Sequence, residues 1–175
     1  MNLLEYSMFS VFRLLRKLRF RGIISETTST GRFTDYFKGF EKVEAVREIF
    51  GEKTEEVLRN LKIELMGFGG YMGVDDTNGH LMVNARYLNT GDKIDIYLDA
   101  IHELCHVKQF MEGKELFDSQ YDYIERPTEI EAYSYAVKEA RRLRLSDERI
   151  CQYLKTEWMS DSDLKRLAKT LGVTC

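Results

Sequence analysis

The chain has 175 residues, of which 43% are hydrophobic and 31% are charged, a composition that excludes a disordered chain and fits one soluble globular domain. Its net charge of −3 argues against nucleic acid as the partner. The three cysteines, Cys105, Cys151 and Cys175, cannot form a disulfide framework, and their odd number suits a reducing compartment, so we expect a cytoplasmic protein.

Residues 1–25 combine aliphatic and basic side chains. No uncharged run approaches the roughly 18 residues that a membrane span needs, and the positive charges follow the apolar run, whereas in a signal peptide they precede it. Two interpretations of residues 1–21 stay open: an amphipathic helix that makes a peripheral contact with a membrane or a partner, or a helix that covers the domain's own core. Residues 26–40 begin in a Ser/Thr-rich run and are predicted as a linker to a main domain at 41–175.

Short elements are predicted between residues 41 and 91 from apolar periodicity and from turn residues. They are a helix at 41–50, a helix capped by Thr54 and running to Leu61, a strand at 62–66, a bend at 67–73, a hairpin turn at 75–79 and a strand at 79–87. The last strand precedes the helix that is predicted from Asp92 to about Glu112. It is either an edge to which an extended peptide pairs or an ordinary strand.

Longer helices are predicted in the second half. Asp92 is placed to cap a helix that runs to about Glu112, although residues 94–98 also fit a short strand. Pro127 suits the first turn of a helix that continues to about Leu145. Two more helices follow, one restarting at Ser146 and one at 164–171 with its cap at 160–163. The expected fold is therefore α+β, with a small, mostly antiparallel sheet packed on two long helices.

The motif His102-Glu103-x-x-His106 lies inside the first long helix and contains two of the chain's three histidines. Residues four apart share a helix face, so both imidazoles can reach one metal ion. Glu103 lies beside the first ligand, where its carboxylate can take a proton from water, as in zinc hydrolases. The alternative is a surface helix that carries two histidines by chance.

A catalytic zinc ion generally takes three protein ligands, so a third ligand must come from elsewhere in the chain. At about 100° per residue, Glu129 falls on the small, apolar face of the helix that begins at Pro127, whereas Glu131 falls on a charged face beside Lys138 and Arg142. The residues on the face of Glu129 are Ala132, Tyr133, Ala136, Ala140 and Leu143. A buried carboxylate needs a partner such as a metal ion, so Glu129 is predicted as the ligand and Glu131 as a solvated ion-pair member.

Together, His102-Glu103-x-x-His106 and the later Glu129-x-x-Ala132 resemble the gluzincin pattern, and the chain from about residue 41 to 173 is similar to the small soluble minigluzincins. The pattern also occurs in the membrane-embedded CAAX prenyl proteases. The resemblance implies a zincin-like fold, zinc-dependent peptidase activity and a latent, zymogen-like form. Tyr133 stands where the larger relatives have an Asp that orients the first histidine, and its hydroxyl is expected to accept that hydrogen bond.

The sequence therefore predicts a zinc metallopeptidase that binds one Zn²⁺ per chain through His102, His106 and Glu129 and cleaves peptide or protein substrates with Glu103 as general base and acid. Hydroxyl donors for the oxyanion are sought among Tyr121, Tyr123, Tyr133 and Tyr135. Cys175 is either a thiolate ligand that keeps the enzyme latent or a free terminal thiol. The alternative function is a non-catalytic zinc-binding interaction module.

Overall fold

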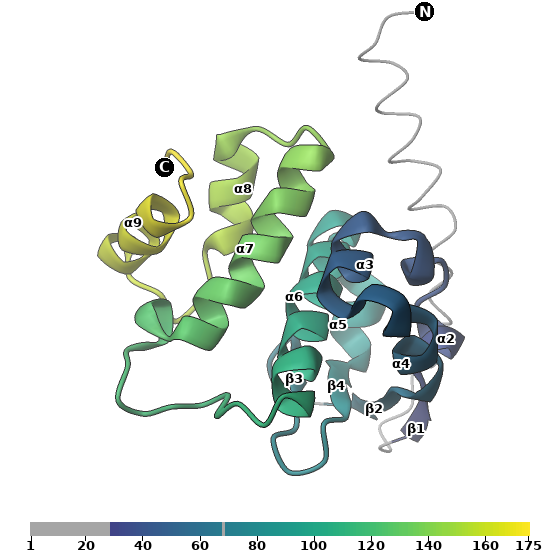
Figure 1. Ribbon diagram of the computed structural model, residues 1–175. Coiled ribbons are helices and arrows are strands. Elements are labelled where there is room, and N and C mark those ends of the chain that lie inside the picture. The colour runs from purple at the N-terminus through teal and green to yellow at the C-terminus, as the bar shows by residue number, and fades with distance from the viewer. Residues whose placement is uncertain (1–28, 68) are drawn as a thin grey trace, which may run out of the picture.

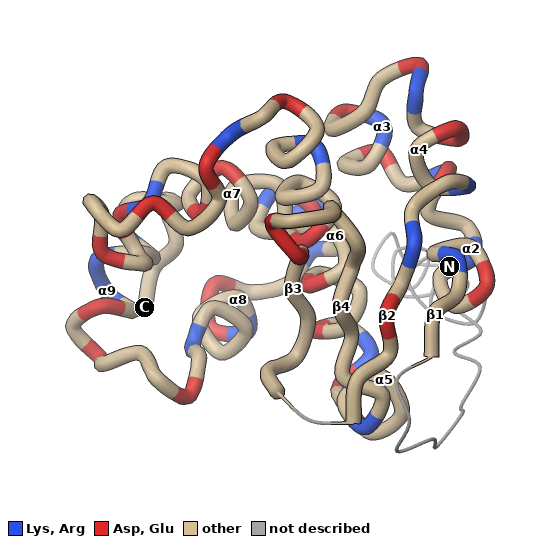
Figure 2. The backbone as a smooth tube through the Cα atoms, turned by 90° about the horizontal axis from the view of Figure 1, so that it is seen from below, with Lys and Arg blue, Asp and Glu red and all other residues tan. Residues whose placement is uncertain are grey.

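The sheet has four strands, β1 (Ser29–Arg32), β2 (Lys62–Met66), β3 (Met72–Val74) and β4 (Leu81–Asn84), in the computed structural model, which describes residues 29–67 and 69–175. Their spatial order is β1-β2-β4-β3, which Figure 2 shows from below. The β1–β2 and β3–β4 pairs are antiparallel and the β2–β4 pair is parallel. Alternate side chains of β2 and β4, among them Ile63, Leu65, Leu81 and Val83, are buried in the core.

The hairpin between β3 and β4 is confirmed, and of the two interpretations of the strand at 79–87 the ordinary strand holds and the peptide-pairing edge does not. Strand β4 lies between β2 and β3, so among the described strands β3 is the edge next to the long helix α6. Strand β4 is also short, because Asn84 caps the following helix α5 (Ala85–Thr90): its Oδ1 accepts from the N–H groups of Arg86 and Tyr87. Gly79 closes the hairpin turn with a positive φ of 72°.

Two long helices confirm the main prediction for the second half. Helix α6 (Lys93–Met111) starts at Asp92, whose Oδ1 accepts from the N–H groups of Ile94 and Asp95, and this cap rules out the short strand. Helix α7 (Pro127–Arg142) begins with its proline in the first turn and packs along α6. Its Ala132, Ala136 and Ala140 are fully buried, so the two backbones can approach closely.

The shorter helices lie on either side of α6 (Figure 1). On one side are α2 (Phe33–Tyr36), α3 (Glu44–Phe50) and α4 (Thr54–Asn60), and on the other are α8 (Asp147–Leu154) and α9 (Asp161–Thr170). Thr54 is the first residue of α4 rather than its cap, and its hydroxyl donates to the carbonyl of Gly51. Helix α9 starts three residues earlier than predicted, since Ser160 alone serves as its cap.

The predicted linker at 26–40 is wrong for its described part, residues 29–40. Strand β1 pairs with β2, and the N–H of Phe33 donates to the carbonyl of Leu61 at 2.8 Å. Phe33, Phe37 and Phe40 pack on one another in the core, with ring centroids 4.8–5.6 Å apart. The end of the Ser/Thr-rich run therefore belongs to an edge strand whose residues alternate between partly buried and exposed.

The predictions for residues 1–25, including the membrane contact, lie outside the described residues. Within residues 29–67 and 69–175, no helix has both the length and the apolar character needed to cross a bilayer. Basic and acidic residues are interspersed along the described helices in Figure 2, so none of these helices collects the positive charge of a nucleic-acid surface.

A disulfide joins Cys151 in α8 to Cys175 at the end of the chain, contrary to the expectation from the cysteine count. The Cα atoms of the two residues are 5.7 Å apart. Their separation of 24 residues carries no pairing signal in the sequence. The pair forms because the segment after α9 returns to α8, where the N–H of Thr174 also donates to the carboxylate of Asp147. Cys105 is a buried free thiol on α6.

Candidate metal centre

His102, His106 and Glu129 converge at the interface of α6 and α7, as the sequence predicts. The two histidines are one turn apart on α6, with their Nε2 atoms separated by 3.0 Å. Glu129, in the first turn of α7, places Oε2 3.2 Å from Nε2 of His102 and 3.5 Å from Nε2 of His106. All three side chains are buried. The three residues form a group that can hold one metal ion.

Spacing and chemistry both fit a metal site. Ligand atoms about 2.0–2.1 Å from a tetrahedral metal ion lie about 3.3 Å from one another, and the three observed separations bracket that value. Oε2 of Glu129 is buried without a hydrogen-bond partner in the described part of the chain, so an acceptor is directed at the centre of the group. Two imidazole nitrogens and one carboxylate oxygen are also the donor set of catalytic, rather than structural, metal sites.

The group is electrostatically coupled. Burial opposes the charge of Glu129, but the two histidines outweigh it and hold the pKa of this carboxyl well below its usual range. Burial lowers the pKa of His102. For His106, burial is outweighed by Glu129 and Glu103, which raise its pKa to about 9. A cation that binds here must displace a proton from His106, so its binding would release protons.

Glu103 follows His102 on α6 and faces the same cleft. Its side chain is 8% exposed, and none of the described residues hydrogen-bonds its carboxylate. Burial, together with the nearby charges of Glu129 and Asp99, raises the pKa of Glu103 to about 8 despite the opposing effect of His106. The carboxylate is therefore free to exchange a proton with a molecule in the cleft.

The cleft in front of these residues has a volume of about 210 Å³. It is lined by β3 with the residues before it, by α6, by α7 with the segment before it, and by α8 with the segment after it. Three large aromatic and apolar side chains at its rim, Tyr71, Phe117 and Trp158, are 39–63% exposed. The lining residues besides these are Gly70, Met72, Gly73, Val74, Asp99, His102, Glu103, His106, Leu116, Tyr123, Glu129, Tyr133, Tyr153 and Thr156.

Of the predicted hydroxyl donors, two lie in the cleft. Tyr123 and Tyr133 line it and hydrogen-bond each other through their hydroxyls at 2.8 Å. Burial raises the pKa of both phenols above the ordinary value, so both remain protonated donors. Tyr135 instead lies beside Lys108 outside the cleft, and Tyr121 is exposed.

The expected hydrogen bond from His102 to the hydroxyl of Tyr133 is absent. That hydroxyl is paired with Tyr123, and Nδ1 of His102 is buried with no hydrogen-bond partner among residues 29–67 and 69–175. The ring of Tyr133 contacts the imidazole edge to face, with centroids 4.3 Å apart. A tyrosine is too long for the role of an aspartate here, so it packs on the ring instead of accepting its proton.

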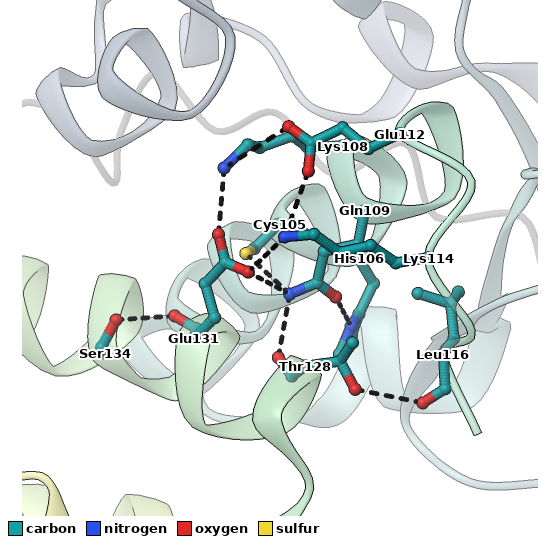
Figure 3. A network of polar contacts seen from close by, with 10 residues as sticks. All are labelled: Cys105, His106, Lys108, Gln109, Glu112, Lys114, Leu116, Thr128, Glu131 and Ser134. Carbon is teal, nitrogen blue, oxygen red and sulfur yellow. Dashed lines mark hydrogen bonds and ion pairs between the residues drawn. The ribbon is translucent and has the colours of Figure 1, made fainter. Parts of the chain in front are cut away.

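Glu131 is ion-paired as predicted, but with different partners. Its carboxylate binds Lys108 and Lys114, which precede α7 in the chain, and also accepts from the amide of Gln109 (Figure 3). The expected partners Lys138 and Arg142 pair with other residues, Glu48 and Glu139. Because Glu131 leans towards α6 rather than solvent, a helical wheel of α7 alone could not identify these contacts.

Sequence reasoning missed two residues of the site. Gln109 is fully buried, and its Oε1 lies 2.7 Å from Nδ1 of His106. Asp99 lines the cleft and accepts from the hydroxyl of Tyr87 at 2.5 Å, while burial raises its pKa to about 7. Each lies three residues from a histidine of the motif, and this spacing on a helix is the signal that could have found them.

Cys175 is not a ligand of the site. Its sulfur is bonded to Cys151, and neither cysteine lines the cleft. The hypothesis that this thiolate keeps the enzyme latent is therefore wrong for the disulfide-bonded form described. In comparisons with protein-family models, curated proteins and solved structures, nothing matches this chain, so the resemblance to minigluzincins rests on its sequence motifs alone.

Proposed function

We propose that this chain is a zincin-like, zinc-dependent metallopeptidase. The observation that carries the proposal is the convergence of His102, His106 and Glu129 in a cleft, where the carboxylate of Glu103 lies beside them without a hydrogen-bond partner among the described residues. One Zn²⁺ per chain is the ion that best suits two imidazoles and one carboxylate with room for further ligands.

Zinc held by these three residues would supply a Lewis acid that polarises the scissile carbonyl and acidifies the attacking water. Glu103 takes the proton from that water and delivers it to the leaving amine. A carboxyl whose pKa is raised to about 8 can carry a proton in both directions near neutral pH. The hydroxyls of Tyr123 and Tyr133 lie in the same cleft, and the one that accepts their mutual hydrogen bond keeps its own proton free to donate to the oxyanion.

An extended peptide or protein segment is the substrate that suits the cleft. The edge strand β3 forms part of its wall, and the free edge of a strand can pair with the backbone of a peptide. The exposed aromatic side chains at the rim offer contacts to apolar substrate residues. The latent form that the family resemblance implies stays a prediction, because no described residue closes the cleft by ligating the metal group.

Metal analysis of the purified full-length protein, combined with cleavage of a broad peptide library, tests the proposal. We expect about one zinc ion per wild-type chain, loss of zinc in His102→Ala and His106→Ala, and retention of zinc without cleavage in Glu103→Ala. Equal metal content in the wild type and both histidine variants would refute the metal site. Zinc binding with no cleavage by the wild type would favour the alternative function, a zinc-binding interaction module.

A further inference from the structure

The side-chain amide of Gln109 is the best-anchored polar group next to the metal centre. Gln109 is fully buried between α6 and α7. Its Nε2 donates to the carbonyl of Thr128 and to the carboxylate of Glu131, each at 3.0 Å, while its Oε1 faces Nδ1 of His106 at 2.7 Å. Figure 3 shows these contacts as one continuous network that reaches from the charged surface to the imidazole.

These contacts permit only one orientation of the amide. A carbonyl and a carboxylate can only accept hydrogen bonds, so the NH₂ group of Gln109 must face Thr128 and Glu131. A flipped amide would direct its oxygen at two acceptors. Oε1 is therefore the atom that faces His106, and because it can only accept, Nδ1 of His106 must carry a proton. The remaining nitrogen, Nε2, faces His102 and Glu129 and is the atom available to a metal ion.

Glu131 holds the amide in place and is itself held. Its Oε1 binds Lys108 at 2.9 Å, and its Oε2 binds Lys114 at 3.0 Å in addition to Gln109. Both lysines also contact Glu112, which no hydrogen bond in Figure 3 joins to Gln109. Glu112 therefore shares the lysines of Glu131 but lies outside the path to His106, which makes it a matched control.

We propose that Gln109 and, through it, Glu131 are positioning residues that preset the tautomer and ring orientation of His106 for metal binding. This inference rests on the proposed metal site and adds residues outside the His-Glu-x-x-His…Glu pattern. Partners of this kind typically change metal affinity by about 10–100-fold when they are removed. His102 has no such partner among the described residues, so the preorganisation is confined to one of the two histidines.

Zinc affinity by chelator competition is the first test, with full-length Gln109→Met, Glu131→Gln and Glu112→Gln. Methionine keeps the length of glutamine and removes both its acceptor and its donors. We expect Gln109→Met to lose about 10–100-fold in zinc affinity, Glu131→Gln to lose less, and Glu112→Gln to match the wild type. Equal affinities of Gln109→Met and Glu112→Gln would overturn the inference. So would a lower melting temperature of metal-free Gln109→Met with unchanged zinc affinity, because that result describes a purely structural residue.

Nitrogen-15 NMR of the metal-free protein separates this inference from the proposed function. The chain has only three histidines, so single variants assign the imidazole signals. We expect a slowly exchanging Nδ1–H resonance of His106 that disappears in Gln109→Met and persists in Glu112→Gln. If the wild type binds no zinc, the metallopeptidase proposal fails while this measurement still decides the role of Gln109. A His106 that is protonated only on Nε2 would contradict the role.

Discussion

The two histidines of the motif have the same neighbours on the metal side and opposite environments behind them. Nδ1 of His106 is held by Gln109, which is held by Thr128 and Glu131. Nδ1 of His102 is buried without a hydrogen-bond partner in the described part of the chain. Its ring is confined by packing against Tyr133 instead. One half of the site is therefore fixed by directional polar contacts and the other half by shape.

Two carboxyl groups near the site, Glu131 and Asp99, also differ in their surroundings. Glu131 lies near two lysines and Gln109, which outweigh its partial burial and lower its pKa to about 2. Asp99, one turn before His102, is partly buried beside Tyr87, and its desolvation raises its pKa to about 7. The side of His106 thus contains a permanently charged anchor, whereas the side of His102 contains a carboxyl that titrates near neutral pH. We therefore expect His106 to be the more rigidly oriented of the two imidazoles.

The largest effect is expected at the one ligand that joins the two halves. Glu129→Ala removes the only ligand that α7 contributes, so we expect zinc affinity to fall by more than about 100-fold, beyond the effect of losing an outer partner. The melting temperature of the zinc-loaded protein should fall with it, because the stabilisation by the bound ion is lost. Isothermal titration calorimetry and thermal unfolding with and without a chelator measure both effects.

The matched change at Glu131 sharpens this prediction. Glu131→Ala leaves all three ligands in place and disturbs only the anchor of Gln109, so it should retain zinc with reduced affinity. A Glu129→Ala protein that binds zinc as the wild type does would mean that the third ligand lies elsewhere, and the comparison of the two halves would lose its basis.

The next effect concerns pH and distinguishes Asp99 from Glu131. The folded-state pKa of Asp99, about 7, lies above its usual 3.8, so its stability contribution is complete below about pH 4 and is lost as the pH rises through about 7. At about 1.4 kcal/mol per unit, the loss is at most about 4 kcal/mol. Urea unfolding of the metal-free Asp99→Asn protein should therefore show a free energy of unfolding that falls less between pH 4 and pH 8 than that of the wild type.

The contribution of Glu131 to the pH dependence of stability should have the opposite sign. Its folded-state pKa is lowered from 4.5 to about 2, so its contribution is present above about pH 4.5 and is lost as the pH falls through about 2. Glu131→Gln should therefore change the acid side of the stability curve and leave the slope between pH 5 and pH 8 as in the wild type. For Asp99, parallel curves of unfolding free energy against pH for the wild type and Asp99→Asn would show that this carboxyl does not titrate between pH 4 and pH 8.

The ligand set could be predicted from the sequence because every step of that prediction is local. The spacing of His102 and His106 fixes their common helix face, and the wheel of α7 separates the buried Glu129 from Glu131. The helix caps Asp92 and Ser146 could be predicted for the same reason, because each side chain accepts a hydrogen bond from a backbone N–H two or three residues later in the chain.

The features that sequence reasoning missed depend on contacts between distant segments. Glu131 pairs with Lys108 and Lys114 because α6 and α7 pack together, which no periodicity of one helix encodes. The disulfide of Cys151 and Cys175 requires the return of the chain end to α8. The sequence left the place of β4 in the sheet open, because a strand pattern does not specify its neighbours; the parallel pairing of β2 with β4 makes β3 the edge strand instead.

The smallest expected effect is at Tyr133, and it tests whether His102 is held by packing alone. Its hydroxyl bonds to Tyr123 and not to His102, so Tyr133→Phe should leave zinc affinity unchanged and cost about 1 kcal/mol of stability, the usual value of one hydrogen bond. Tyr123→Phe is the matched control, because it removes the other hydroxyl of the same pair. The double variant should cost less than the sum of the two single changes, since neither hydroxyl is then left without its partner. A tenfold loss of zinc affinity in Tyr133→Phe alone would show that this hydroxyl supports His102 after all, and the two histidines would then be equally held.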